Sequence, residues 1–324
     1  NYQTNEGKAF LKRVFYRDQY LDAVLEPSRM FLIGEKGTGK TAYASFLSNE
    51  EYNNTASSTV VTGTTDYKKF FALKSAGQLP VSDFVDCWKT IILLLVAEHL
   101  TRREKPGFAF SDKFRKLRSA IDDYYESAFD PEVARAIEFV RDAESTATLM
   151  VRSTGVAEKD RESQTDKGTK FQTSLYIIER QIRAAISSLK LTKNHVLFLD
   201  GIDVRPSDLA FDDYIAIVRG LANAVWDLNQ DFFSRIKDSP GRIKVVMLVR
   251  PDIFDSVEFQ NANAKIRDNA VVLNWQTTYD NYRSSRIFAL IDGILAKQQG
   301  HPTLPIGSAW DHYFNYNVPN MRIA

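Results

Sequence analysis

The chain has 324 residues, enough for about two domains, and its 44% hydrophobic and 26% charged residues are ordinary for a globular protein. The net charge of +1 favours no class of partner, whether nucleic acid or an acidic surface. One cysteine, Cys87, excludes an intramolecular disulfide framework, and the four histidines (His99, His195, His301 and His312) lack the spacing of metal ligands.

No stretch of the sequence indicates insertion into a membrane. The longest purely apolar run, Ile91 to Ala97, is far too short to span a bilayer, and no signal peptide is visible. Together with the single cysteine, these features predict a cytoplasmic protein that has no membrane partner. Because the chain opens on Asn1 and stops at Ala324, we also expect a fragment of a longer protein.

The first strong signal in chain order follows residues 1–29, whose apolar residues recur at helical spacing. Residues 34–41 read G-x-x-x-x-G-K-T; the apolar run before them predicts a strand, and residues 42–47 after them predict a helix. In this setting the glycines let backbone N–H groups point at an anion, and the helix adds the positive end of its dipole. The pattern therefore predicts a loop that binds the phosphates of a nucleotide.

Lys40 of this loop is expected to reach the β- and γ-phosphates, and the Thr41 hydroxyl is expected to bind Mg²⁺. No N-K-x-D segment for guanine recognition follows, so we expect ATP and Mg²⁺ as the cofactors. Residues 1–29 then either flank the base of the nucleotide or cover an edge of the sheet. The expected nucleotide contacts are Gly34, Glu35, Lys36, Gly37, Thr38, Gly39, Lys40, Thr41 and Ala42.

After the loop, the sequence predicts one strand and then a long helical region. Residues 58–62, a β-branched run, predict the strand. Residues 151–170 have almost no apolar periodicity and are expected to form a mobile loop. The expected helices are 42–50, 85–100, 114–125, 132–143 and 175–189.

A second buried strand, residues 195–199, is followed directly by the letters D-G-I-D. Mg²⁺ is a hard cation that takes carboxylate and hydroxyl oxygens alongside phosphate oxygens. We therefore assign Asp200 to the metal together with Thr41, and Asp203 to the base that orients or deprotonates the attacking water. The alternative for Asp203 is an aspartate that caps a helix or a turn.

Several arginines are candidates for contacts to phosphate. Arg250 follows the third predicted strand, residues 243–249, and is expected either to sense the γ-phosphate or to form a surface salt bridge. Arg267 precedes the last predicted strand and is the candidate arginine finger toward a neighbouring subunit, with an ordinary solvated charge as the alternative. Arg283 and Arg286 begin the last predicted helix and are candidate phosphate contacts from a lid. The expected catalytic residues are Lys40, Asp203, Arg250 and Arg267.

The remaining elements complete an alternation of strands and helices. Helices are expected at 212–228, 254–263 and 282–299 and a last strand at 270–275, whereas no structure is assigned to 300–324. This alternation predicts an α/β fold with a mainly parallel sheet that helices cover on both faces. Ligands on such sheets bind at the carboxyl ends of the strands, where the residues assigned above fall.

Several segments resemble the AAA+/STAND side of the P-loop ATPases. V-L-F-L-D-G-I-D (196–203) is similar to the NACHT-type pattern, and M-L-V-R (247–250) resembles the arginine sensor of STAND and origin-recognition-like ATPases. Residues 195–275, with L-V-R-P-D-I-F and K-I-R-D-N, look like a bacterial family of origin-recognition-like P-loop ATPases, some of which are thought to act in antiphage defence. The resemblance implies a three-layer P-loop fold whose five-stranded sheet has the Arg250 strand between the loop strand and the Asp200 strand.

The resemblance also implies a division of the chain. Residues 30–68 and 195–277 are expected to form the ATPase core, and residues 69–194 a large helical insert. Residues 278–324 are expected to form a helical lid and tail, and residues 1–29 a segment that flanks the nucleotide site.

For function, we expect a Mg²⁺-dependent ATPase that changes conformation or assembles with nucleotide, as a homo-oligomer or with an effector protein. One alternative is a DNA-bound initiator or loader, which the basic run 113–118 and the nearby Arg102, Arg103 and Lys105 favour. The other alternative is a nucleotide-binding scaffold that hydrolyses little. An ABC ATPase is not expected, because the sequence has no L-S-G-G-Q segment.

Overall fold

Five parallel strands form one sheet in the order β2-β3-β4-β1-β5. Because β4 lies between β1 and β3, the strand order is the one that the resemblance implied, and the prediction of an α/β fold with a mainly parallel sheet is confirmed. The strands are β1 (Phe31–Gly34), β2 (Thr55–Val61), β3 (Asn194–Asp200), β4 (Ile243–Val249) and β5 (Ala270–Leu273). This computed structural model describes residues 4–75, 84–104, 108–125, 132–154, 167–257, 268–278, 280–298 and 304–314.

Side chains of the strands alternate between two hydrophobic cores, one on each face of the sheet. On β4, Val245, Met247 and Val249 belong to one core, whereas Val246 and Leu248 belong to the other. Burial of both faces explains why these strands read as continuous apolar runs. The first core is covered by α4 (Thr64–Ser75), α5 (Phe84–Arg103), α10 (Phe211–Asp227) and α11 (Pro251–Ser256), and the second by α1 (Asn5–Val14), α2 (Gln19–Ala23) and α3 (Lys40–Asn49).

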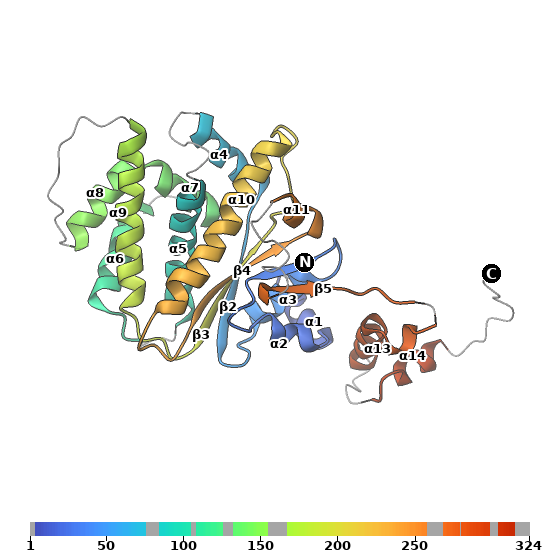
Figure 1. The fold of residues 1–324 in the computed structure, drawn as a ribbon. Helices are drawn as coiled ribbons and strands as arrows, with labels where there is room; N and C mark the ends of the chain where they lie inside the picture. The colour runs from blue at the N-terminus through green and yellow to red at the C-terminus, as the bar shows by residue number, and fades with distance from the viewer. Residues whose placement is uncertain are drawn as a thin grey trace.

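The helical insert stands to one side of the sheet (Figure 1). Its central helix is α5, which is buried on nearly all sides because α7, α9 and α10 pack around it. A helix in such a position needs apolar residues all round, and this explains the continuous apolar run that the sequence showed. Other helices in the described part of the insert are α6 (Asp112–Tyr125), α7 (Glu132–Arg141), α8 (Ala143–Thr154) and α9 (Lys167–Ser187).

The carboxyl ends of the strands meet at one edge of the sheet. In the parallel pairing Gly34 lies beside Leu273. Likewise, Asp200 lies beside Val61, the last residue of β2. The loops that follow the strands therefore leave the sheet at this edge, and the side chains on them are brought together there.

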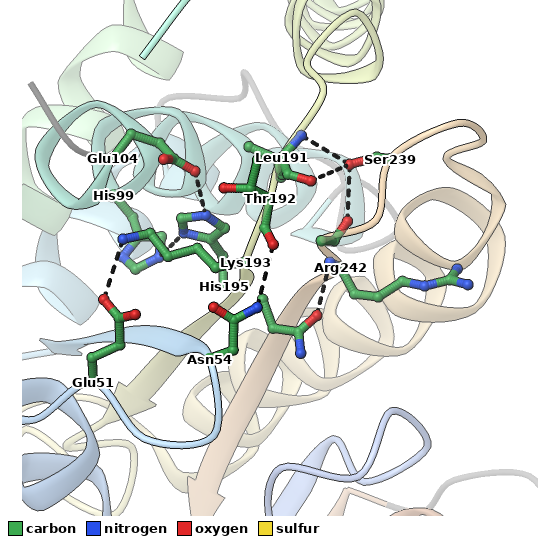
Figure 2. Close-up of polar contacts among 12 residues, drawn as sticks. Glu51, Asn54, His99, Glu104, Leu191, Thr192, Lys193, His195, Ser239 and Arg242 are labelled. Carbon is green, nitrogen blue, oxygen red and sulfur yellow. Dashed lines mark hydrogen bonds and ion pairs between the residues drawn. The ribbon is translucent and has the colours of Figure 1, made fainter. Parts of the chain in front are cut away.

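Two of the histidines join the insert to the sheet in a buried polar cluster, which Figure 2 shows. His99 on α5 and His195 on β3 are 4% and 1% exposed, and the Nε2 atom of His99 lies 3.1 Å from the Nδ1 atom of His195. His195 Nε2 lies 2.8 Å from Glu104 Oε1, and His99 Nδ1 lies 2.8 Å from Ser58 Oγ on β2. Burial lowers the pKa of both imidazoles, so the folded chain holds both rings neutral.

This buried pair should make the fold less stable in mild acid. The unfolded chain protonates His99 and His195 near pH ~6.5, whereas the folded chain protonates them only at lower pH. Because the unfolded state then holds more protons, the free energy of unfolding should fall by roughly 1 kcal/mol per pH unit for each histidine below about pH 6.5. Urea unfolding at about pH 7.5 and about pH 5.5 measures the difference. Equal stability at the two pH values would contradict a neutral histidine pair.

The C-terminal helices lie beyond β5, at the end of an extended segment (Figure 1). Helix α13 (Arg286–Gln298) packs against the N-terminal segment, where Lys297 Nζ donates to Phe15 O. An added Cβ at Gly293 would lie 2.5 Å from the Tyr16 ring, so only glycine allows this close approach. The N-terminal segment therefore lies between the sheet and the C-terminal helices.

The structure corrects several expectations about the elements. Residues 151–154 end α8 and residues 167–170 begin α9, so the predicted loop 151–170 is wrong at both ends, and its middle lies outside the described residues. Backbone hydrogen bonds extend α8 and α9 beyond the residues whose apolar spacing indicates a helix, so the spacing alone placed the helix ends too early or too late. Helix α4 was not predicted and crosses the expected boundary at residue 69. Residues 300–324, which had no assignment, contain α14 (Ser308–Tyr313).

Candidate functional site

The loop 34–41 follows β1 and continues directly into α3. Gly37 and Gly39 have φ angles of 89° and 93°, in the left-handed region that other residues rarely adopt. Gly34 is constrained by space, because an added Cβ would lie 2.4 Å from Thr38 Oγ1. These glycines allow a tight loop at the N-terminus of a helix, the local structure that binds anions.

Lys40 is folded back into this loop. Its Nζ atom donates hydrogen bonds to Gly34 O at 2.7 Å and to Glu35 O at 3.2 Å, and the residue is only 8% exposed. Burial lowers the pKa of the Lys40 ammonium group, and the charges of Asp203 and Asp200 act in the opposite direction. The structure thus brings the predicted lysine within electrostatic range of both predicted carboxylates.

Thr41 and Asp200, 159 positions apart in the sequence, meet at the edge of the sheet: Thr41 Oγ1 donates to Asp200 Oδ2 at 2.7 Å. The other carboxylate oxygen accepts from the Gly201 N–H at 2.8 Å. One hydroxyl and one carboxylate fit Mg²⁺, which is commonly held by one or two carboxylates and completes its shell with phosphate oxygens and water. Among the described residues, no group of three or more His, Cys, Asp or Glu side chains is arranged to hold a metal.

The turn after β3 is held by Gly201 and by two tyrosines that were not selected as site residues from the sequence. Gly201 has a φ angle of 79°, and an added Cβ would lie 2.3 Å from Thr62 O. Ile202 O accepts hydrogen bonds from the hydroxyl of Tyr214 on α10 and, at 3.5 Å, from that of Tyr67 on α4. The turn therefore requires glycine at position 201 and is hydrogen-bonded to two helices of the neighbouring core.

Asp203 lies half-buried in this turn. It caps no helix, because the N-cap of α10 is Ala210. Within the described part of the chain its carboxylate makes no side-chain hydrogen bond, while its charge acts on Lys40. A general base needs a carboxylate that is not already paired, so Asp203 keeps its assignment as a prediction.

Arg250 follows β4 and is the N-cap residue of α11. Its guanidinium group donates twice to Asp252, from Nε to Oδ1 at 3.0 Å and from Nη2 to Oδ2 at 2.7 Å. This is the salt bridge that was expected as the alternative to a phosphate sensor. Arg250 also acts electrostatically on Lys40, so it lies near the loop, and the Asp252 carboxylate competes with a phosphate for its charge.

Releasing Arg250 should therefore favour nucleotide binding. Both partners of this ion pair are partly exposed, and such a pair is worth at most about 1 kcal/mol. If Arg250 senses the γ-phosphate, Asp252→Asn should strengthen ATP binding by up to about fivefold, because the competing carboxylate charge is lost. Calorimetric titration with ATP measures the change. If Asp252→Asn and Arg250→Ala both bind ATP like the parent, Arg250 is a surface charge only.

The contacts of two other candidate arginines, Arg283 and Arg286, lie away from the loop, and the third candidate is Arg267. Arg267 lies outside the described residues, so its role as an arginine finger stays a prediction. Arg283 pairs with Asp311 through bonds of 2.6 and 3.1 Å. The Arg286 guanidinium group lies 4.6 Å from the centre of the Tyr20 ring and donates to its hydroxyl. In this arrangement the contacts described for both side chains lie within the C-terminal helices and the N-terminal segment.

A tryptophan that was predicted only as a strand residue holds the loop. Trp275 Nε1, just after β5, donates to Thr38 O at 2.9 Å. The Trp275 ring also packs edge-on against Tyr20, with ring centres 5.8 Å apart. The N-terminal segment therefore lies next to the loop and also packs against β5, so its place beside the base of a nucleotide stays a prediction.

Comparison of the chain with protein-family models, with curated proteins and with solved structures found no match. Among the described residues, no helix is both long enough and apolar enough to cross a membrane. The geometry of the site is therefore the basis for assigning a function.

Proposed function

We propose that the chain is a P-loop ATPase that binds Mg-ATP at residues 34–41 and hydrolyses it, and that it acts as a nucleotide-dependent switch of conformation or assembly. The observation that carries this proposal is the 2.7 Å hydrogen bond between Thr41 Oγ1 and Asp200 Oδ2. It joins a phosphate-binding sequence to an acidic strand end at the edge of a parallel sheet where ligands bind. The strand order agrees with the ATPase resemblance.

Each residue of the site has a role that follows from its chemistry. The backbone N–H groups of the loop and the dipole of α3 bind the phosphates, and Lys40 exchanges its loop carbonyls for phosphate oxygens. Thr41 and Asp200 hold Mg²⁺, which neutralises charge on the phosphates. Asp203 accepts the proton of the water that attacks the γ-phosphorus, while the bond to the leaving ADP oxygen breaks.

Contacts of the site support the role of a switch. Trp275 connects the loop to the segment that leads to the C-terminal helices. Ile202, in the turn before Asp203, is hydrogen-bonded to helices α4 and α10. A ligand that changes the loop or this turn can thus bias the C-terminal helices and the helical insert, and through them an oligomer or an effector protein.

A DNA-bound initiator or loader is the second candidate. The basic run 113–118 lies on α6, whose basic side chains are exposed, but Arg115 and Arg118 pair with aspartates of the same helix. Carboxylates interspersed among the basic groups weaken the attraction of this face for DNA phosphates. We therefore favour the switch, with DNA binding as an outcome of the test.

Release of inorganic phosphate from ATP, measured together with molecular mass in solution, tests the proposal. We expect turnover that requires Mg²⁺, and a mass or an elution volume that differs between ATP and ADP. Turnover that appears only with duplex DNA would favour the loader instead. Tight ATP binding without turnover in either condition would favour a scaffold.

A further inference from the structure

A hollow lies along the edge strand β2 and is lined by residues of α3 and α5. It has a volume of 520 Å³, within the range of pockets for small ligands. β2 is the last strand of the sheet, so helices from the two faces meet around its open side. Its wall is rich in hydroxyl groups, from Thr41, Ser45, Ser48, Ser58 and Thr59.

Positive charge predominates in this hollow. Lys8, Arg102 and Arg103 line it, and Glu98, its only acidic lining residue among those described, is paired with Arg102. Arg103 is half-buried, yet its guanidinium group donates only to neutral oxygens: from Nε to Ser58 Oγ at 3.0 Å and from Nη2 to Ser48 O at 2.7 Å. Within the described residues, neither Lys8 nor Arg103 has a carboxylate partner. A half-buried guanidinium group without a counter-charge is costly unless an anion joins it.

The hydrogen-bond chain behind Arg103 fixes its orientation. Arg103 can only donate, so Ser58 Oγ accepts from it and donates its own proton to His99 Nδ1. His99 Nε2 then donates to His195 Nδ1, and His195 Nε2 donates to the Glu104 carboxylate (Figure 2). Both rings are neutral in this chain, which agrees with the lowered pKa of each. Every member is satisfied, so the chain holds the guanidinium group rigidly at the wall of the hollow.

A smaller hollow of 340 Å³ adjoins the first. The two share Lys8, Ser48, Asn49 and Arg103, so Lys8 and Arg103 lie where the two hollows meet. The described lining of both contains no Phe, Tyr or Trp on which a nucleobase would stack. Anion-binding groups together with many hydroxyls, and without an aromatic platform, suit a ligand that carries phosphate and hydroxyl groups but no base.

We propose that this hollow is a second ligand site, which binds a small phosphorylated sugar or sugar-like molecule with a phosphate group at Arg103 and Lys8. The hydroxyl side chains of α3 and β2 contact the hydroxyl groups of the ligand. The site shares Thr41 with the phosphate loop, but its charged groups, Lys8 and Arg103, lie outside residues 34–41, so the site does not depend on ATP being the ligand of the loop.

Calorimetric titration with fructose 1,6-bisphosphate and with inorganic tripolyphosphate tests this site. The protein is the full chain carrying Lys40→Ala, so that binding of either probe at residues 34–41 is suppressed. We expect the sugar bisphosphate to bind with one-to-one stoichiometry and more tightly than tripolyphosphate, which offers charge but no hydroxyl groups. Lys8→Glu should weaken its binding by about tenfold or more, because a charge-assisted contact is lost and a repulsive one is added.

Lys8 is exposed on α1, so Lys8→Glu should leave the fold intact. Arg103→Gln is the second variant and should weaken binding at least as much. Lys116→Glu is the matched control, since it makes the same change of charge at an exposed position of α6 away from both hollows. The proposal is overturned if the sugar bisphosphate does not bind, if tripolyphosphate alone binds, or if Lys116→Glu weakens binding as much as Lys8→Glu.

Discussion

Replacing Asp203 with asparagine should slow ATP turnover by about 10²–10⁴-fold, the usual contribution of a positioned general base. The carboxylate is half-buried beside Lys40, and its side chain makes no hydrogen bond within the described part of the chain. Asparagine has nearly the same shape but cannot accept a proton from water. ATP binding should therefore stay close to that of the parent, because Lys40, Thr41 and Asp200 are unchanged.

Asp212→Asn is the matched control for this variant. Asp212 is an exposed aspartate in the first turn of α10, a few residues beyond the turn that carries Asp203. Its replacement removes the same charge from an exposed position on the helix that follows the turn, and should leave turnover within about twofold. If Asp203→Asn turns over like the parent while the control is also unchanged, Asp203 is only a turn residue and the base lies elsewhere.

Replacing Asp200 with asparagine should instead remove most of the Mg²⁺-dependent part of ATP affinity. Asp200 Oδ2 accepts from Thr41 Oγ1 at 2.7 Å, so the carboxylate and the hydroxyl face the same position. Partners that merely orient a metal ligand contribute about 10–100-fold to metal affinity, and a carboxylate that holds the ion should contribute at least as much. ATP affinity with and without Mg²⁺ should therefore differ much less in Asp200→Asn than in the parent.

Thr41→Val gives an independent test of the same site, because it removes the other oxygen without changing any charge. We expect it to reduce the effect of Mg²⁺ in the same direction as Asp200→Asn. If both variants keep the full Mg²⁺ dependence of the parent, the ion is held by other groups.

Much of the fold could be predicted because it depends on local patterns. Continuous apolar runs marked β3 and β4, since strands buried on both faces need apolar residues at every position. The phosphate loop is a local motif whose glycines, lysine and threonine act within a few residues of one another. Its meeting with Asp200 followed from the rule that parallel strands end at one edge of a sheet.

The rest of the site depends on contacts between residues that are far apart and individually ordinary. Nothing in the sequence distinguishes Trp275, which holds Thr38, from a tryptophan of the core. The same is true of Tyr67 and Tyr214, which hold the carbonyl before Asp203. His99 and His195 are far apart in the sequence. Their spacing does not show that α5 packs against β3, the contact that brings the two rings together. One contact did have a local signal: an aspartate two residues after Arg250 could have indicated the salt bridge.

The central claim is that residues 34–41 bind Mg-ATP through Lys40. The most direct test is to unfold the parent and Lys40→Ala by heat or denaturant, each with and without Mg-ATP. A ligand at about a hundred times its dissociation constant should add ~2.7 kcal/mol to the free energy of unfolding of the parent. Lys40→Ala should lose most of this gain while remaining folded without nucleotide. A variant that Mg-ATP stabilises as much as the parent would contradict the claim and move the nucleotide site away from the loop.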